Sequence, residues 1–168
     1  MGCMCPHATI LIQPYGNFTK KEIEKVIPKL KEELDRWAYG AWTFEILDSK
    51  PFPTNRAIDI LREQKKYKLK NDEVLMGLTH EDIKADVHNV KNYGIVGLAF
   101  LRGYVCVVSD KRLKDKSQIW KPMIHEFMHA FFASPHCPND DPTCYMKDAK
   151  GKGNFGIQDK MCDSCKRW

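Results

Sequence analysis

The chain has 168 residues, 43% of them hydrophobic and 29% charged, which is the composition of an ordinary globular protein. Its net charge is +5, from 27 basic and 22 acidic residues, and we find no basic cluster interleaved with aromatic residues as in nucleic-acid readers. No apolar run approaches the ~20 residues needed to span a bilayer. These features favour one domain with its own core, and they argue against a nucleic-acid partner and a membrane span.

The first six residues lack the charged and long apolar regions of a signal peptide. Pro6 also breaks the myristoylation pattern, which needs Ser or Thr there. We therefore expect a cytoplasmic monomer, with export after removal of a leader as the alternative. Four of the seven cysteines lie in the last 32 residues, and this clustering suits a metal site better than a disulfide framework.

Strand and helix signals alternate along the first part of the chain. A helix over residues 20–37 is indicated by apolar positions at helical spacing, with Asn17 or Thr19 as its cap. We predict a hairpin turn at Arg102-Gly103, and we expect Thr79 to cap a short helical turn through Asp82. The other predicted elements are a helix over 55–69 and strands over 7–13, 42–47, 73–79, 94–100 and 104–109.

This order predicts an α/β (α+β) fold with a mixed twisted sheet, two backing helices and a third, active-site helix under the sheet. After Cys137 the pattern breaks into a Pro-, Gly- and Asp-rich tail that carries cysteines. We expect an N-terminal subdomain over residues 1–136 and a small, zinc-tied C-terminal subdomain over residues 137–168. Together they would form one catalytic domain.

The third helix carries His125-Glu126-Phe127-Met128-His129, an H-E-x-x-H pattern. Residues four apart lie on one face of a helix, so two imidazoles can bind one metal ion while the adjacent carboxylate reaches a water on it. The segment is apolar nearly all round, as in a buried helix. The alternative is a pair of hydrogen-bonded core histidines.

A catalytic zinc needs three protein ligands and an open position. His136 is the expected third ligand, because Ser134-Pro135 can end the helix and let the chain turn back. Glu126 is expected to act as the general base, taking a proton from the zinc-bound water and passing it to the leaving amine.

Four cysteines form a second constellation with the spacing C-x6-C-x17-C-x2-C: Cys137, Cys144, Cys162 and Cys165. Four thiolates suit a closed tetrahedral structural zinc. Two disulfides or a redox-active C-x-x-C are the alternatives. Cys106 is expected to be a buried free thiol, and Cys3 and Cys5 receive no role.

The run His125-Glu126-x-x-His129 … His136-Cys137 … Cys144-x-Met146 … Cys162-x-x-Cys165 resembles the archaemetzincins, zinc metallopeptidases of the metzincin clan. The family pattern is H-E-x-x-H-x-x-G-x-x-H-C-x4-C-x-M with a closing C-x-x-C, and similar pieces occur upstream, such as residues 93–100. The resemblance implies two zincs per chain, one on the three histidines and one on the four cysteines. It also implies Met146 in a Met-turn beneath the catalytic metal.

Two departures from this pattern concern the third ligand. Phe132 stands where the family has Gly, and one extra residue separates His129 from His136. The first cysteine pair is also two residues further apart. Residues 133–135 are expected to make a wider turn in place of the tight glycine turn.

The leading hypothesis is therefore a zinc-dependent peptidase acting on a peptide or protein substrate, its endopeptidase or aminopeptidase type left open. The rivals are a catalytically inactive, zinc-stabilised binding or scaffold relative, and a thiol oxidoreductase using Cys162 and Cys165. We expect His80 and His88 to be solvated and Tyr145 to have a packing role.

Overall fold

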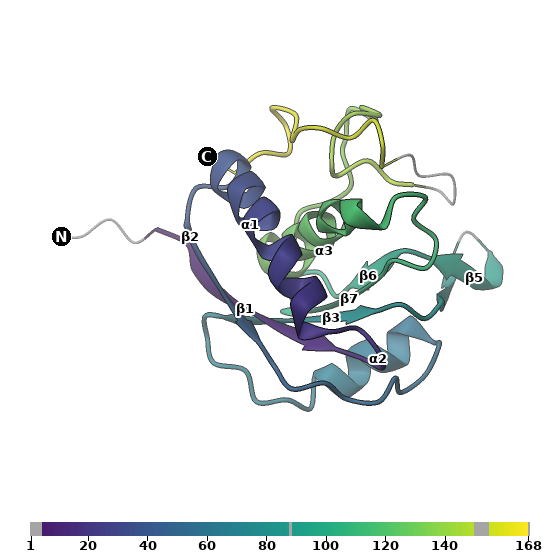
Figure 1. The fold of residues 1–168 in the computed structure, drawn as a ribbon. Helices are drawn as coiled ribbons and strands as arrows, with labels where there is room; N and C mark the ends of the chain where they lie inside the picture. The colour runs from purple at the N-terminus through teal and green to yellow at the C-terminus, as the bar shows by residue number, and fades with distance from the viewer. Residues whose placement is uncertain (1–4, 88, 150–154, 168) are drawn as a thin grey trace.

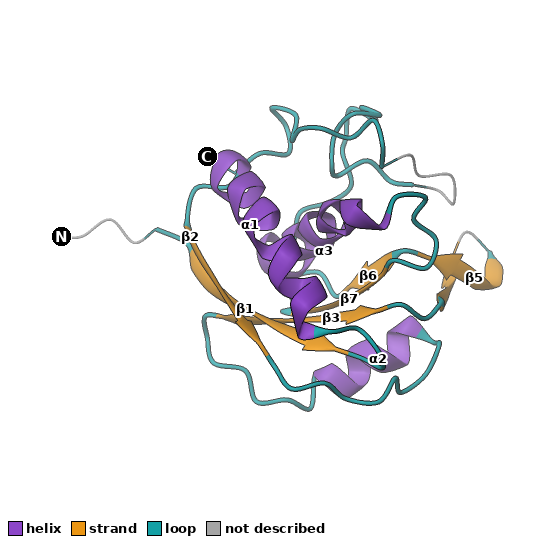
Figure 2. Cartoon of the chain, viewed as in Figure 1, coloured by secondary structure: helices purple, strands orange, loops and turns teal. Residues whose placement is uncertain are grey.

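The computed structural model describes residues 5–87, 89–149 and 155–167. The elements follow in the order β1 (His7–Pro14), α1 (Lys20–Trp37), β2 (Ala41–Ile46), α2 (Ala57–Gln64), β3 (Glu73–Thr79), β4 (Ile83–Val87), β5 (Val90–Ile95), β6 (Gly97–Ala99), β7 (Val105–Ser109), a 3₁₀ helix (Lys116–Ile119) and α3 (Trp120–Phe132). Figure 1 shows their arrangement and Figure 2 separates helices from strands. In this described part, no helix has the length and apolarity to cross a membrane.

A five-stranded sheet has the order β2-β1-β3-β7-β6. Its first four strands are parallel, and the short β6 joins β7 in antiparallel orientation at the edge. β4 and β5 form a separate antiparallel ribbon. The central strands β1, β3 and β7 are buried over most of their length, as expected of parallel strands covered on both faces.

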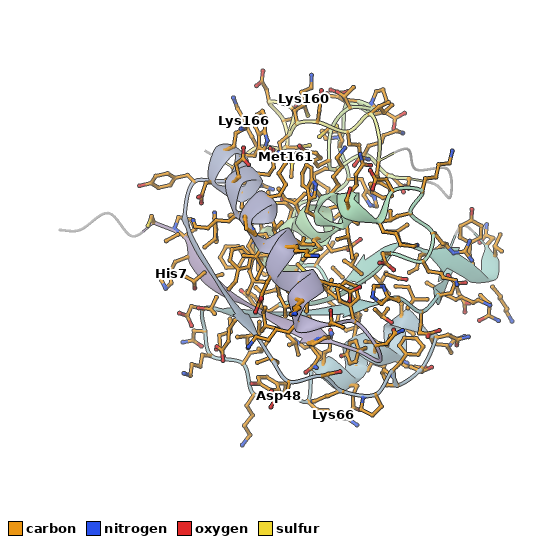
Figure 3. All side chains as sticks on the ribbon, viewed as in Figure 1. His7, Asp48, Lys66, Lys160, Met161 and Lys166 are labelled. Atoms are coloured by element: carbon orange, nitrogen blue, oxygen red, sulfur yellow. The ribbon has the colours of Figure 1, made fainter. Side chains whose placement is uncertain are left out.

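The helices cover both faces of the sheet. α1 and α3 pack together on one face, and α2 lies on the other (Figure 1). The larger core cluster joins α1 and α3 to residues of the C-terminal tail, while the smaller one lies under α2. Figure 3 labels Lys160, Met161 and Lys166 of that tail on the α1 side and Lys66 on the α2 side. The mixed twisted sheet and the buried third helix confirm the predicted fold class.

α1 begins at a capping box in which Glu22 N donates to the Thr19 hydroxyl and Thr19 N donates to the Glu22 carboxylate. Thr19 rather than Asn17 is therefore the cap, and the helix has the bounds predicted from its periodicity. α2 is shorter than the predicted 55–69: it ends at Gln64, and the Lys-rich stretch that follows runs through turns before Leu69 packs against the smaller core cluster.

Two expectations for the middle of the chain are wrong. No helical turn follows Thr79: its hydroxyl accepts from Glu81 N in a bend, and the chain then enters β4, which the sequence did not indicate. The predicted strand 94–100 is two strands, because the chain bends at Val96 and changes partner from β4 to β7. This change of partner carries the chain from the ribbon to the edge of the main sheet.

The hairpin predicted at Arg102-Gly103 is present between β6 and β7. The 3₁₀ helix ahead of α3 is capped by Asp115, whose carboxylate accepts from Ser117 N.

Candidate metal centres

α3 is buried on most of its surface, and this places three polar side chains in an apolar setting. Ile124, Phe127 and Met128 are fully buried. His129 is 8% exposed and Glu126 is 6% exposed, and both belong to the same helix. Buried imidazoles and carboxylates are costly unless their polar atoms are paired or bound. The positions of those atoms therefore show what the site can hold.

Each histidine of α3 donates its Nδ1 proton to a backbone carbonyl. His125 Nδ1 lies 2.7 Å from the Tyr145 oxygen, and His129 Nδ1 lies 2.5 Å from the Ser134 oxygen. Because a carbonyl oxygen can only accept, the proton is on Nδ1 and the Nε2 lone pair is left free. This is the arrangement found behind metal-ligating histidines.

The two Nε2 atoms face each other at 3.0 Å. Two lone pairs at this distance repel unless a proton or a cation lies between them. In a tetrahedral zinc site with Zn–N bonds of about 2.0 Å, the nitrogens are about 3.3 Å apart. The geometry of the two imidazoles therefore fits a shared metal ion.

His136 joins them from beyond the end of α3. Its ring centroid lies 5.3 Å from that of His125 and 4.9 Å from that of His129. One ligand atom from each of the three residues lies within 4.8 Å of the others. His136 is more exposed than the other two, and its Nδ1 lies 3.7 Å from the Asp148 carboxylate.

The turn that returns His136 to the site is made by Ala133. This residue ends α3 in the left-handed conformation, with φ 55° and ψ 30°, and its N–H donates to Met128 O. Left-handed backbone normally favours Gly, so Ala133 supplies one position later the turn that the family pattern assigns to Gly. Phe132 stays in the helix, and the expected wider turn is observed.

Arg167 braces this turn from the C-terminal tail. Its guanidinium donates two hydrogen bonds to the Ser134 hydroxyl, at 2.8 and 3.2 Å, and lies over the Phe132 ring. The backbone of Arg167 pairs with the end of α1, where its N–H donates to Trp37 O. The carbonyl that orients His129 belongs to Ser134, whose hydroxyl is held by Arg167. Arg167 is itself held at the end of α1.

Glu126 lies beside the imidazoles, with Oε1 4.0 Å from His125 Nε2. Its side chain runs along the edge strand β6: a Cβ placed on Gly97 would come within 2.8 Å of Glu126 Cγ and Oε1. Burial raises the pKa of Glu126 to about 8. Burial, followed by the neighbouring His129, lowers the pKa of His125 to about 3, so the imidazole is neutral.

The three imidazoles and Glu126 open into a cleft of about 1310 Å³. One wall is formed by the end of β5 and by β6, and another by residues 112–115. Pro135, Asp148 and Phe155 line the side of the C-terminal tail. The cleft reaches the imidazoles of His125 and His129, so a ligand in it can meet their free Nε2 atoms.

The four clustered cysteines meet beside the end of α1. One sulfur from each lies within 4.8 Å of the others, and Cys137 Sγ and Cys162 Sγ are 3.6 Å apart. In a tetrahedral zinc site with Zn–S bonds of about 2.3 Å, the sulfurs are about 3.8 Å apart. The four are free thiols, and the N–H groups of Met146 and Cys162 donate to Cys144 Sγ. The donor set fits a structural zinc.

His136 and Cys137 are consecutive, so one short segment supplies a ligand atom to each cluster. Met146 is fully buried in the same core cluster as α3, and its carbonyl accepts from Cys137 N. Tyr145 is buried, which agrees with a packing role, and Cys106 is a fully buried free thiol.

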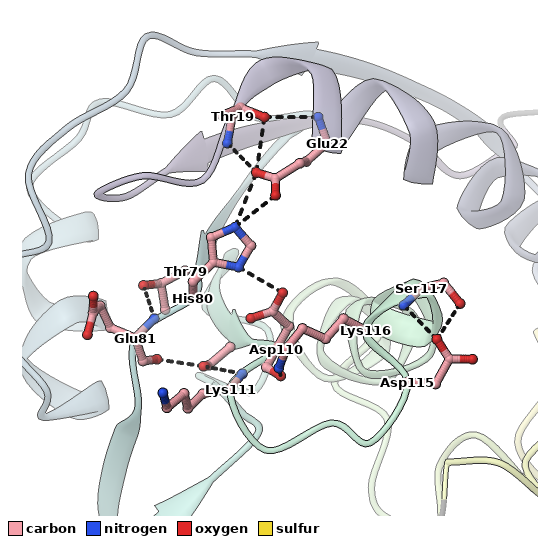
Figure 4. A network of polar contacts seen from close by, with 11 residues as sticks. Thr19, Glu22, Thr79, His80, Glu81, Asp110, Lys111, Asp115, Lys116 and Ser117 are labelled. Carbon is pink, nitrogen blue, oxygen red and sulfur yellow. Dashed lines mark hydrogen bonds and ion pairs between the residues drawn. The ribbon is translucent and has the colours of Figure 1, made fainter.

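His80, expected to be solvated, is partly buried, and both of its ring nitrogens face carboxylates. Its Nδ1 lies 2.8 Å from the Asp110 carboxylate and its Nε2 lies 3.1 Å from the Glu22 carboxylate (Figure 4). Its ring also stacks on that of Phe18. These partners are 30 and 58 residues away in sequence, so no local pattern indicates them. His88 and Cys3 lie outside the described residues.

Comparison with protein-family models and with curated proteins finds no match. Among solved structures, the archaemetzincin of Methanopyrus kandleri superposes with a TM-score of 0.75 at 21% identity, over 98% of this chain and 94% of that one. The archaemetzincin of Archaeoglobus fulgidus, complexed with malonate, gives 0.68 at 21% identity, over 94% of this chain and 97% of that one. The chain has an archaemetzincin-like fold.

Proposed function

We propose that the protein is a zinc-dependent metallopeptidase that hydrolyses peptide bonds with Glu126 as general base. The observation that carries this proposal is the free, converging Nε2 atoms of His125 and His129, each fixed by a carbonyl behind it, next to a buried carboxylate in an open cleft. The similarity of the fold to archaemetzincin structures supports the same reading.

In this proposal His125, His129 and His136 hold the catalytic ion. When bound, zinc would lower the pKa of a water ligand to about 7 and polarise the carbonyl of the scissile bond. Burial raises the pKa of Glu126 to about 8, and a cation on the neighbouring imidazoles would lower it again. Glu126 would then accept the proton of the attacking water and deliver it to the leaving amine. The β6 edge beside Glu126 limits where this carboxylate can move.

The second ion belongs to Cys137, Cys144, Cys162 and Cys165, which would tie the C-terminal subdomain (residues 137–168) to the subdomain over residues 1–136. Met146 would occupy the Met-turn. The substrate would be a peptide or protein segment in the cleft, and the protein would act as a monomer.

The test compares wild type with Glu126→Gln and with Glu24→Gln, an exposed carboxylate of α1 that serves as the matched control. Metal analysis should find two zincs per chain in all three proteins. Turnover of a peptide mixture should fall by about 10²- to 10⁴-fold in Glu126→Gln alone. An unchanged rate in Glu126→Gln rules out the mechanism.

An inactive, zinc-stabilised binding module is the second candidate. It is favoured by His136, which is exposed and whose Nδ1 lies 3.7 Å from the Asp148 carboxylate, whereas His125 and His129 donate to backbone carbonyls. A wild-type protein that holds both zincs but cleaves no peptide in the mixture would establish this alternative. Loss of the zinc at the imidazole site in His136→Ala would show that this site needs all three imidazoles to hold its metal.

A further inference from the structure

Glu33 of α1 is a buried carboxylate outside the cleft, with 2% of its surface exposed. Its Oε2 accepts from Trp37 Nε1 at 2.8 Å and from the Tyr145 hydroxyl at 3.1 Å. Its Oε1 faces Lys29 at 3.3 Å and Arg36 at 3.7 Å. A buried carboxylate with donors and cations on both oxygens is held in one position.

Tyr145 connects this carboxylate to the metal centre. Tyr145 is 1% exposed. Its hydroxyl donates a hydrogen bond to Glu33, and its carbonyl accepts the Nδ1 proton of His125. Its own N–H donates to Lys160 O. One residue therefore touches α1 through its side chain and α3 through its backbone.

We propose that Glu33 and Tyr145 are positioning residues that aim the imidazole of His125 at the metal. The inference rests on the proposed function, since it requires a metal on that imidazole. A carbonyl behind a ligating histidine fixes the ring's orientation and raises its basicity. Glu33 holds the hydroxyl of Tyr145, the residue that supplies this carbonyl, so Glu33 acts on His125 through Tyr145.

The experiment titrates the metal-free protein with Co²⁺ and with Zn²⁺ in competition with a chelator. Cobalt bound to four sulfurs gives intense charge-transfer absorption, and cobalt bound to imidazoles gives weak d–d bands, so the two sites are read separately. The test variant is Tyr145→Phe, which removes only the hydroxyl. The matched control is Trp37→Phe, which removes the other hydrogen bond on the same Glu33 oxygen and leaves the Tyr145 hydroxyl bonded to it.

Tyr145→Phe should weaken metal binding at the three imidazoles by about fivefold and shift the d–d bands, with binding at the four sulfurs unchanged. Trp37→Phe should lower stability without either change. Glu33→Gln keeps an acceptor for the Tyr145 hydroxyl and should stay closer to wild type than Tyr145→Phe.

Equal effects of Tyr145→Phe and Trp37→Phe on the imidazole site, or no effect of Tyr145→Phe, would overturn the inference and leave the proposed function intact. Wild-type protein that takes no metal at the imidazoles would overturn the proposed function as well. The two failures are thus distinct.

Discussion

Two clusters in this molecule are built around histidine, and they hold the ring in opposite charge states. At His80 both ring nitrogens face carboxylates, from Glu22 and Asp110. At His125 and His129 the Nδ1 atoms face backbone carbonyls, and the Nε2 atoms face each other. The first arrangement favours a protonated imidazolium, and the second favours a neutral imidazole with a free lone pair.

The pKa shifts follow from these partners. At His80 burial lowers the pKa, but the hydrogen bonds to Asp110 and Glu22 outweigh it and the pKa is raised. At His129 burial is the largest effect and the pKa is lowered, although the Ser134 carbonyl opposes it. The hydrogen-bond partners of a histidine therefore decide whether its ring holds a proton or offers a lone pair to a metal, and burial alone does not.

The largest expected effect is on zinc binding, which should depend on His129 of the metal cluster and not on His80 of the carboxylate-bound cluster. His129→Ala should lower the zinc affinity of the imidazole site by more than 10- to 100-fold, which is the typical loss when a hydrogen-bond partner of a metal ligand is removed. His80→Ala should leave both zincs in place. Metal content after dialysis against a weak chelator measures this difference. Equal zinc loss in the two variants would remove the distinction between the clusters.

The next effect concerns the carboxylate of the metal cluster. Gly97→Ala places a methyl group within 2.8 Å of the Glu126 side chain and should displace that carboxylate. We expect kcat to fall by about 10- to 100-fold with zinc retained, because small displacements of a catalytic group have effects of this size. Adding Gly97→Ala to Glu126→Gln should cause little further loss. A large additional loss would mean that Gly97 acts elsewhere.

The carboxylate-bound cluster should appear in the pH dependence of stability. The pKa of His80 in the folded protein is raised above the ordinary value of 6.5. The stability that protonated His80 contributes is therefore fully present below pH 6.5 and is lost as pH rises through the raised pKa. His80→Gln should flatten this decline, by less than about 1 kcal/mol for a partly exposed pair. Urea unfolding of the zinc-loaded protein between pH 6 and 9 measures it. A decline of the same steepness in the variant would show that another group titrates.

The smallest effect concerns the backbone of the metal cluster. Ala133→Gly should stabilise the protein by about 1 kcal/mol, since Gly adopts the left-handed conformation without strain. The expected rise in Tm is about 2–4 °C. Ala130→Gly, within α3, should lower Tm and serves as the control. A lower Tm for Ala133→Gly would mean that the methyl group packs favourably in the turn.

Local pattern accounts for what the sequence predicted correctly. The apolar period of α1 and the apolar runs of β1 and β3 predict these elements close to their observed bounds, and the H-E-x-x-H spacing groups His125 with His129. The roles of these residues in catalysis remain predictions. The features that were not predicted depend on contacts between separate segments. β4 is a strand because it pairs with β5, and His80 is held by Glu22 and Asp110, which are distant in sequence.

The same limit applied within the site. Nothing adjacent to Ser134 in sequence indicates that Arg167 holds its hydroxyl, and nothing adjacent to Glu126 indicates that Gly97 leaves room for it. Such pairs are found only when the sheet edge and the C-terminal tail are brought against α3.

The single peptide bond between His136 and Cys137 gives the proposed peptidase a sensitivity to thiol chemistry. An oxidant or electrophile that modifies the sulfur cluster would release the loop that carries the third imidazole, although it reacts with no group in the cleft. Inhibition by such reagents would then mimic an active-site inhibitor while acting at the neighbouring ion.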